Sequence, residues 1–127
     1  MDKGALSMSI KIKNNSGMID ISNDVIATVV GGAATDMYGV VGMASRKQVR
    51  DSFNQILGRD SYQKGVVIKQ QGDAITVEVS IIVSYGTKVS EVSKSVQKQV
   101  KYSLQSMLGI EADAVNVIVQ GVRVVGE

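Results

Sequence analysis

The stretch from Ile75 to Tyr85 constrains the fold of this chain more than any other. Apolar residues occupy one set of alternate positions, namely Ile75, Val77, Val79, Ile81, Val83 and Tyr85. The positions between them carry Thr76, Glu78, Ser80 and Ser84, with Ile82 as the one apolar exception. Because successive side chains of a strand point to opposite faces, this alternation of β-branched residues predicts a strand with one buried face.

A hairpin before this strand and a long helix after it are also predicted. Residues 71–73 (Gln-Gly-Asp) are typical of a turn, so a short strand at residues 66–69 is expected to pair with the long one. Residues 88–108 form the predicted helix, and Gly109 stands where a left-handed residue often ends a helix. Its apolar stripe, expected to pack on the buried face of the strand, consists of Val89, Val92, Val96, Val100, Ser103, Leu104 and Met107.

The N-terminal half is expected to contain a strand, a helix and a second strand. Residues 18–21 make a better strand than the short alternation at residues 10–13, which polar residues end at once. Residues 22–24 (Ser-Asn-Asp) can cap a helix at residues 23–37, in which Gly31 and Gly32 would allow close approach to the sheet. A buried strand is expected at residues 40–43.

The remaining segments complete the predicted order. They are a polar link and short helix at residues 44–58, a loop at 59–65 and a last strand at 114–125, in which Gly121 marks either a bulge or the start of fraying. The order β-α-β-(α)-β-β-α-β indicates an α+β fold: a single mixed sheet with two main helices and one short helix. The long helices connect strands on either side, so some strand pairs are expected to be parallel.

The length of 127 residues fits one domain, which we place at residues 8–127. Residues 1–7 precede a second Met and have no apolar segment typical of a secretory signal. We interpret them as an expression scar or a disordered terminus.

The composition excludes most catalytic machinery, because the chain has no Cys and no His. Nucleophile systems built on Cys or His cannot be assembled, and zinc, haem and iron–sulfur sites lose their usual ligands. The only close carboxylate pairs, Asp20 with Asp24 and Glu111 with Asp113, are expected on the surface or at helix caps. We therefore expect no enzyme activity, no catalytic residue, no cofactor and no metal site.

Two further patterns have structural explanations that we prefer. Residues 25–44 carry one charge and approach the length of a membrane span, but four glycines and Asp36 favour a helix followed by a buried strand. Residues 39–42 (Gly-Val-Val-Gly) match the GXXG spacing of KH-type RNA modules, a weak signal by itself. A net charge of +2 and an aromatic content of 4% do not suggest a nucleic-acid-binding surface.

A row of lysines on the long helix is the candidate binding surface. Lys94, Lys98 and Lys101 share the side opposite the apolar stripe, and Tyr102 flanks them. The simpler explanation is a solvated helix face; the functional one is a surface for an acidic partner or an anionic membrane. We select these four residues as candidate partner-binding residues.

Several segments in their order resemble a known family. They are residues 17–22 (Gly-Met-Ile-Asp-Ile-Ser), 38–43 (Tyr-Gly-Val-Val-Gly-Met), 65–68 (Gly-Val-Val-Ile), 83–86 (Val-Ser-Tyr-Gly), 96–97 with Val100, and 115–122 (Val-Asn-Val-Ile-Val-Gln-Gly-Val). Together they resemble the alkaline shock protein family, also called the envelope stress response protein family, of Gram-positive bacteria. The resemblance spans residues 8–125; one departure is Leu108, where a Thr is expected.

The resemblance implies a cytoplasmic, non-catalytic protein linked to cell-envelope stress and homeostasis. It also implies a protein partner, which in some members is membrane-anchored, and self-association in others. The leading hypothesis is therefore a scaffold or interaction protein. Two alternatives stay open: a small RNA-binding module that uses the GXXG segment with Arg46, Lys47, Arg50 and Arg59, and an accessory small-molecule-binding domain.

Overall fold

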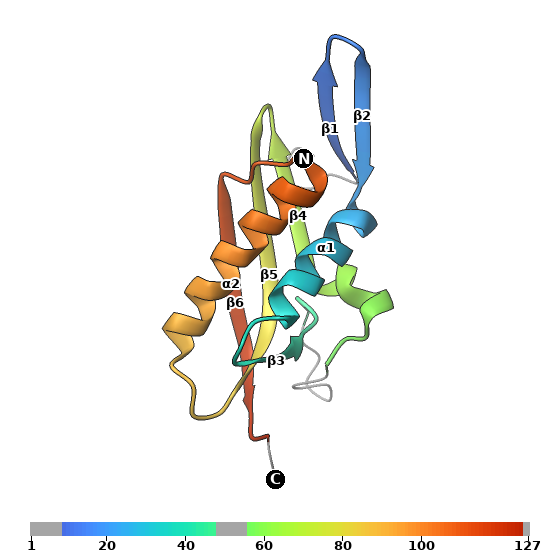
Figure 1. The fold of residues 1–127 in the computed structure, drawn as a ribbon. Coiled ribbons are helices and arrows are strands. Elements are labelled where there is room, and N and C mark those ends of the chain that lie inside the picture. Colours follow the sequence, from blue (N-terminus) through green and yellow to red (C-terminus); the bar gives the residue numbers. More distant parts are fainter. Residues whose placement is uncertain (1–8, 48–55, 126–127) are drawn as a thin grey trace.

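The computed structural model describes residues 9–47 and 56–125, and its main sheet is built around one central strand. The elements are β1 (Ser9–Asn14), β2 (Gly17–Ser22), α1 (Asn23–Thr35), β3 (Val40–Met43), the 3-10 helix η3 (Arg59–Gly65), β4 (Val66–Gln71), β5 (Ala74–Ser84), α2 (Val89–Ser103), the π-helical η4 (Leu104–Leu108) and β6 (Ala114–Arg123). Figure 1 shows α1 and α2 lying across the sheet that contains β5. The α+β class is confirmed.

Strand β5 pairs with three other strands. Strands β4 and β3 both pair antiparallel with one edge of β5, β4 along its first half and β3 along its second half. Val66 lies opposite Val79, and Val40 lies opposite Val83. On the other side β6 runs parallel to it, so both the predicted hairpin and the predicted parallel pairing are confirmed. The register shifts between Val119 and Gly121 and β6 continues to Arg123, so of the two alternatives at Gly121 the bulge is confirmed.

The single sheet is a correction, because the described residues form two sheets. The second is an antiparallel hairpin of β1 and β2, drawn in blue in Figure 1 at the start of α1. We predicted that the polar residues after Lys13 end the short strand there. Instead, these polar residues form the turn of the β1–β2 hairpin. The Asn14 side chain accepts a hydrogen bond from the Ser16 N–H at 2.9 Å, and Gly17 has φ 139°. The observed order therefore begins β-β-α.

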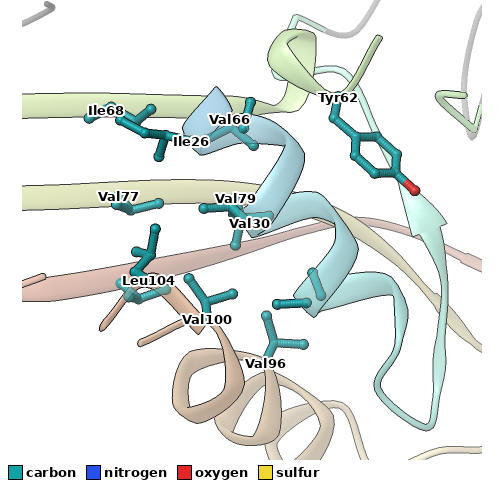
Figure 2. Close-up of a cluster of buried hydrophobic side chains, with 14 of the residues drawn as sticks. Ile26, Val30, Tyr62, Val66, Ile68, Val77, Val79, Val96, Val100 and Leu104 are labelled. Carbon is teal, nitrogen blue, oxygen red and sulfur yellow. The ribbon is translucent and has the colours of Figure 1, made fainter. Parts of the chain in front are cut away.

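The core lies between β5 and the two long helices, as predicted. Figure 2 shows Val77 and Val79 of β5 facing the side chains of α1 and α2. Ile75, Val77, Val79, Ile81 and Val83 are all buried. Tyr85 is the wrong member of this set: β5 ends at Ser84, and Tyr85 is 72% exposed next to Gly86, which has φ 95°. Ile82 is also buried, although it points to the opposite face.

The apolar stripe of the long helix is confirmed in its middle and wrong at its ends. Val92, Val96, Val100, Ser103 and Leu104 are buried, whereas Val89 is 38% and Met107 is 68% exposed. Val89 is the first residue of α2. Met107 lies in η4, where wider π-helical turns rotate side chains away from the directions expected for an α-helix. Gly109 ends the helix with φ 70°, as predicted.

Helix α1 begins as predicted, and its glycines have an unexpected neighbour. The Ser22 side chain accepts a hydrogen bond from the Val25 N–H at 3.4 Å. A Cβ atom at Gly31 would overlap the ring of Tyr62 in η3, whereas one at Gly32 would meet nothing. The nearest neighbour of Gly31 is therefore η3, where our expectation had placed the sheet.

The loop predicted at residues 59–65 is wrong. These residues form η3, and the Tyr62 side chain in it is buried. The short helix predicted at residues 44–58 falls largely on residues 48–55, outside the described residues, as do residues 1–7. In the described ranges, no helix is both long and apolar enough to cross a bilayer. The run at residues 25–44 is divided between α1 and β3, as we preferred.

Candidate functional site

The three selected lysines lie together on the solvent side of α2. Lys94, Lys98 and Lys101 are all exposed, on the side of the helix opposite the buried Val96 and Val100. None of them contributes to the core.

These lysines line a groove between α2 and the start of β6. The groove has a volume of about 710 Å³, within the range of about 300–1,000 Å³ that is typical of ligand sites. Its walls are Glu91, Lys94, Ser95, Gln97, Lys98 and Lys101 from the helix and residues 113–116 from the strand side. The sequence indicated the lysine row, but it could not show that β6 forms the opposite wall.

Tyr102 is exposed, yet it lies apart from this groove. Its side chain is 65% exposed and is not one of the groove-lining residues. On a helix, Tyr102 falls about 40° from Lys98, on the side away from Gln97. The structure thus brings the three lysines together around a groove and places Tyr102 on the neighbouring surface of α2.

Of the three lysines that line the groove, only Lys94 is near a carboxylate of the described residues. Glu91 and Lys94 are 3.9 Å apart and both largely exposed, so their pair contributes at most about 1 kcal/mol to stability. Within the described part of the chain, Lys98 and Lys101 have no carboxylate at salt-bridge distance. Two positive charges are therefore left for an anionic partner.

Of the two carboxylates after the helix, Asp113 has a structural role. The Asp113 side chain accepts a hydrogen bond from the Ile75 N–H at 2.7 Å, while Glu111 is exposed. Across residues 9–47 and 56–125, no three His, Cys, Asp or Glu side chains come together as a metal site.

Gln97 connects the two walls of the groove. Its Nε2 donates a hydrogen bond to the main-chain carbonyl of Val115 at 2.9 Å. Sequence reasoning did not select Gln97. The available signal was its position beside the lysine row, about 40° from Lys101 around the helix.

The GXXG segment belongs to the sheet. The Gly39 carbonyl accepts a hydrogen bond from the Ser84 N–H at 2.8 Å, and Val40 and Gly42 pair with β5. Gly39 has φ 92°, and a Cβ there would lie 2.7 Å from Cγ2 of Val92. A sheet-paired backbone is a poor clamp for a nucleotide backbone. Arg46, Lys47 and Arg59 are exposed, whereas Arg50 lies outside the described residues.

Among the carboxyl groups of the described residues, Asp20 on the β1–β2 hairpin has a shifted pKa. A hydrogen bond from Ser9 is the main cause that lowers the pKa of Asp20, and Lys11, whose Nζ is 3.5 Å from the carboxylate, adds to it. This interaction links the two strands of the hairpin and lies far from the lysine row in sequence.

One protein family and several curated sequences match this chain. The sequence profile of the alkaline shock protein 23 family, described as having a cell envelope-related function, matches residues 11–124. The uncharacterized protein Spy1614 of Streptococcus pyogenes serotype M6 is 52% identical over 120 residues, covering 94% of this chain and 99% of the relative. The uncharacterized protein YloU of Bacillus subtilis is 51% identical over 117 residues, covering 92% and 98%. No solved structure matches the chain.

Proposed function

Because this chain belongs to the alkaline shock protein 23 family, whose described function is related to the cell envelope, we propose that it is a non-catalytic scaffold or interaction protein of the envelope in Gram-positive bacteria. It binds a protein partner through the solvent side of α2, using Lys94, Lys98 and Lys101, with Tyr102 at the border of the contact. The family description names no reaction, which agrees with a chain that has no Cys and no His.

The observation that carries this proposal is the pair of exposed lysines at positions 98 and 101. Each faces solvent in the groove, and neither is held by a carboxylate of the described residues. Surface charges of this kind steer partners and determine their specificity. The Tyr102 ring, exposed beside Lys98, has the character of residues that dominate binding energy at interfaces.

The partner class is part of the proposal. We place the protein in the cytoplasm, where a membrane-anchored partner holds it at the envelope, and we include self-association through the same face. The alternative RNA-binding function is disfavoured because the GXXG backbone is paired within the sheet.

The test is cross-linked capture from the native cell, with membrane and soluble fractions kept apart. The parent chain is compared with a variant that carries Lys94→Glu, Lys98→Glu and Lys101→Glu. A control with the same charge change carries Lys13→Glu, Lys64→Glu and Lys69→Glu, which are exposed positions on other elements. Loss of partners, or of oligomers, only in the α2 variant supports the proposal, and the parent's binding should weaken as salt rises.

Two results would contradict it. Unchanged partners and unchanged oligomer mass in the α2 variant would leave this face as ordinary solvated surface. Salt-sensitive retention of RNA by the parent and loss of that retention in a variant of Arg46, Lys47 and Arg59 would favour the RNA-binding alternative.

A further inference from the structure

Strand β6 has an open edge beside the lysine-lined groove. In the described parts of the chain it pairs only with β5, on one side. Alternate residues at the start of this strand, among them Val115, therefore direct main-chain groups to an edge that no other described strand covers. Such an edge is a template for pairing with another chain unless something covers it.

The hydrogen bond from Gln97 shows which main-chain groups of β6 lie on its open edge. The Val115 carbonyl accepts its side-chain amide at 2.9 Å, so this carbonyl faces α2. Because alternate residues of a strand direct their main-chain groups to the same side, Val117 shares this edge with Val115. The Gln97 amide therefore occupies the place that the N–H of an added strand would take.

We propose that an acidic, extended segment of a protein partner adds to this edge of β6 as a further strand. The segment lies in the groove between β6 and α2 and replaces the bond from Gln97 to Val115 with a main-chain bond. Its alternate side chains face α2, where their carboxylates pair with Lys98 and Lys101. This inference rests on the proposed function and specifies the chemistry of the partner and its mode of binding.

The charge distribution is the reason for choosing an acidic segment. The groove contains two carboxylates, but Glu91 lies 3.9 Å from Lys94 and Asp113 accepts the Ile75 N–H. Lys98 and Lys101 are one helical turn apart, so they can meet carboxylates at alternate positions of one strand. A basic or neutral segment would leave both lysines without an opposite charge.

The experiment uses a pool of nine-residue peptides with Asp or Glu at alternate positions and Val, Ile or Thr between them. Peptides retained by the immobilised full chain are sequenced, and their affinities are measured. We expect saturable binding that Lys98→Glu with Lys101→Glu weakens by about tenfold or more, and that Lys13→Glu with Lys69→Glu leaves unchanged. The NMR signals of the Gln97 side-chain amide and of residues 114–119 should shift on binding.

A second probe tests strand addition itself. Retained peptides are made again with N-methyl groups on alternate main-chain nitrogens, which removes the donors needed for pairing without changing the protein. We expect these peptides to lose binding in at least one of the two methylation registers. Equal binding in both registers would overturn strand addition while leaving the lysine row as a charged docking face.

Other results separate this inference from the proposed function. Failure to retain any peptide overturns the inference, and so does capture of the chain only by vesicles that contain an anionic lipid. If the triple lysine variant still loses its cellular partners, the proposed function stands without strand addition. If peptides bind as described but cellular partners are unchanged in that variant, the groove binds acidic strands and the proposed function fails.

Discussion

Asp113 and Ile75 are joined by a reciprocal pair of hydrogen bonds. The Asp113 carboxylate accepts the Ile75 N–H, and the Asp113 N–H donates to the Ile75 carbonyl, both at 2.7 Å. This pair lies immediately before the first parallel partners, Thr76 and Ala114. Asp113 therefore fixes the position at which β6 begins to pair with β5.

The first prediction removes this acceptor. Asp113→Ala should lower the free energy of unfolding by about 1–3 kcal/mol, because the partly buried Ile75 N–H loses its partner. Asp113→Asn keeps an acceptor oxygen and should cost less. Glu111→Ala, at an exposed neighbouring position, should stay within about 0.5 kcal/mol of the parent in denaturant unfolding. Equal stability of the two alanine variants would contradict this role.

The second prediction compares two neighbouring glycines of α1. Gly31→Ala should destabilise the protein by about 1–3 kcal/mol, because the new methyl group overlaps the Tyr62 ring. Gly32→Ala should stabilise it by about 0.4–1 kcal/mol, because the position is open and alanine is the better helix former. Thermal unfolding checks both. A double variant with Tyr62→Ala should remove most of the difference between the two sites, and a persistent difference would place the clash elsewhere.

The third prediction concerns the central strand. Val79→Asp should cost several kcal/mol of stability, because Val79 is 0% exposed and its replacement buries an unpaired charge. Val124→Asp makes the same change at a residue that is 63% exposed, and it should have little effect. If Val79→Asp melts within a few degrees of the parent, the buried face of β5 has been assigned incorrectly.

The fourth prediction is a pKa measurement on the hairpin. The pKa of Asp20 should lie below the ordinary aspartate value, and Ser9→Ala and Lys11→Ala should each raise it. Since the folded-state pKa is the lower one, Asp20 stabilises the hairpin above the unfolded-state pKa. That contribution is lost as the pH falls below about 4. An NMR titration of the Asp20 carboxyl carbon measures the shift, and a value unchanged by Ser9→Ala would contradict its cause.

The alternation of β5 was enough to predict the centre of the fold. It identified the buried face, while the turn residues 71–73 predicted the hairpin with β4 and a separate apolar stripe predicted the helix that packs on them. The resemblance to the alkaline shock protein family is likewise confirmed by the match over residues 11–124. Both inferences depend on short local patterns and on their order along the chain.

The errors came from contacts that periodicity does not report. Tyr62 is buried because Gly31 leaves room for its ring, and this pairing joins segments that are far apart in the sequence. Met107 is exposed because a π-helical turn changes the direction of its side chain. The lysine row could be selected from helical spacing alone, but the wall formed by β6 depends on the parallel pairing with β5.

The parallel pairing of β5 and β6 also determines when the groove can exist. The hairpin of β4 and β5 closes through a two-residue turn, whereas β6 reaches β5 only after α2 has crossed between them. Non-local pairs of this kind form late, since the entropy of closing the intervening loop must be lost first. We therefore expect the lysine row and its opposite wall to meet only near the end of folding. A partner that needs both walls would bind only chains that have completed folding.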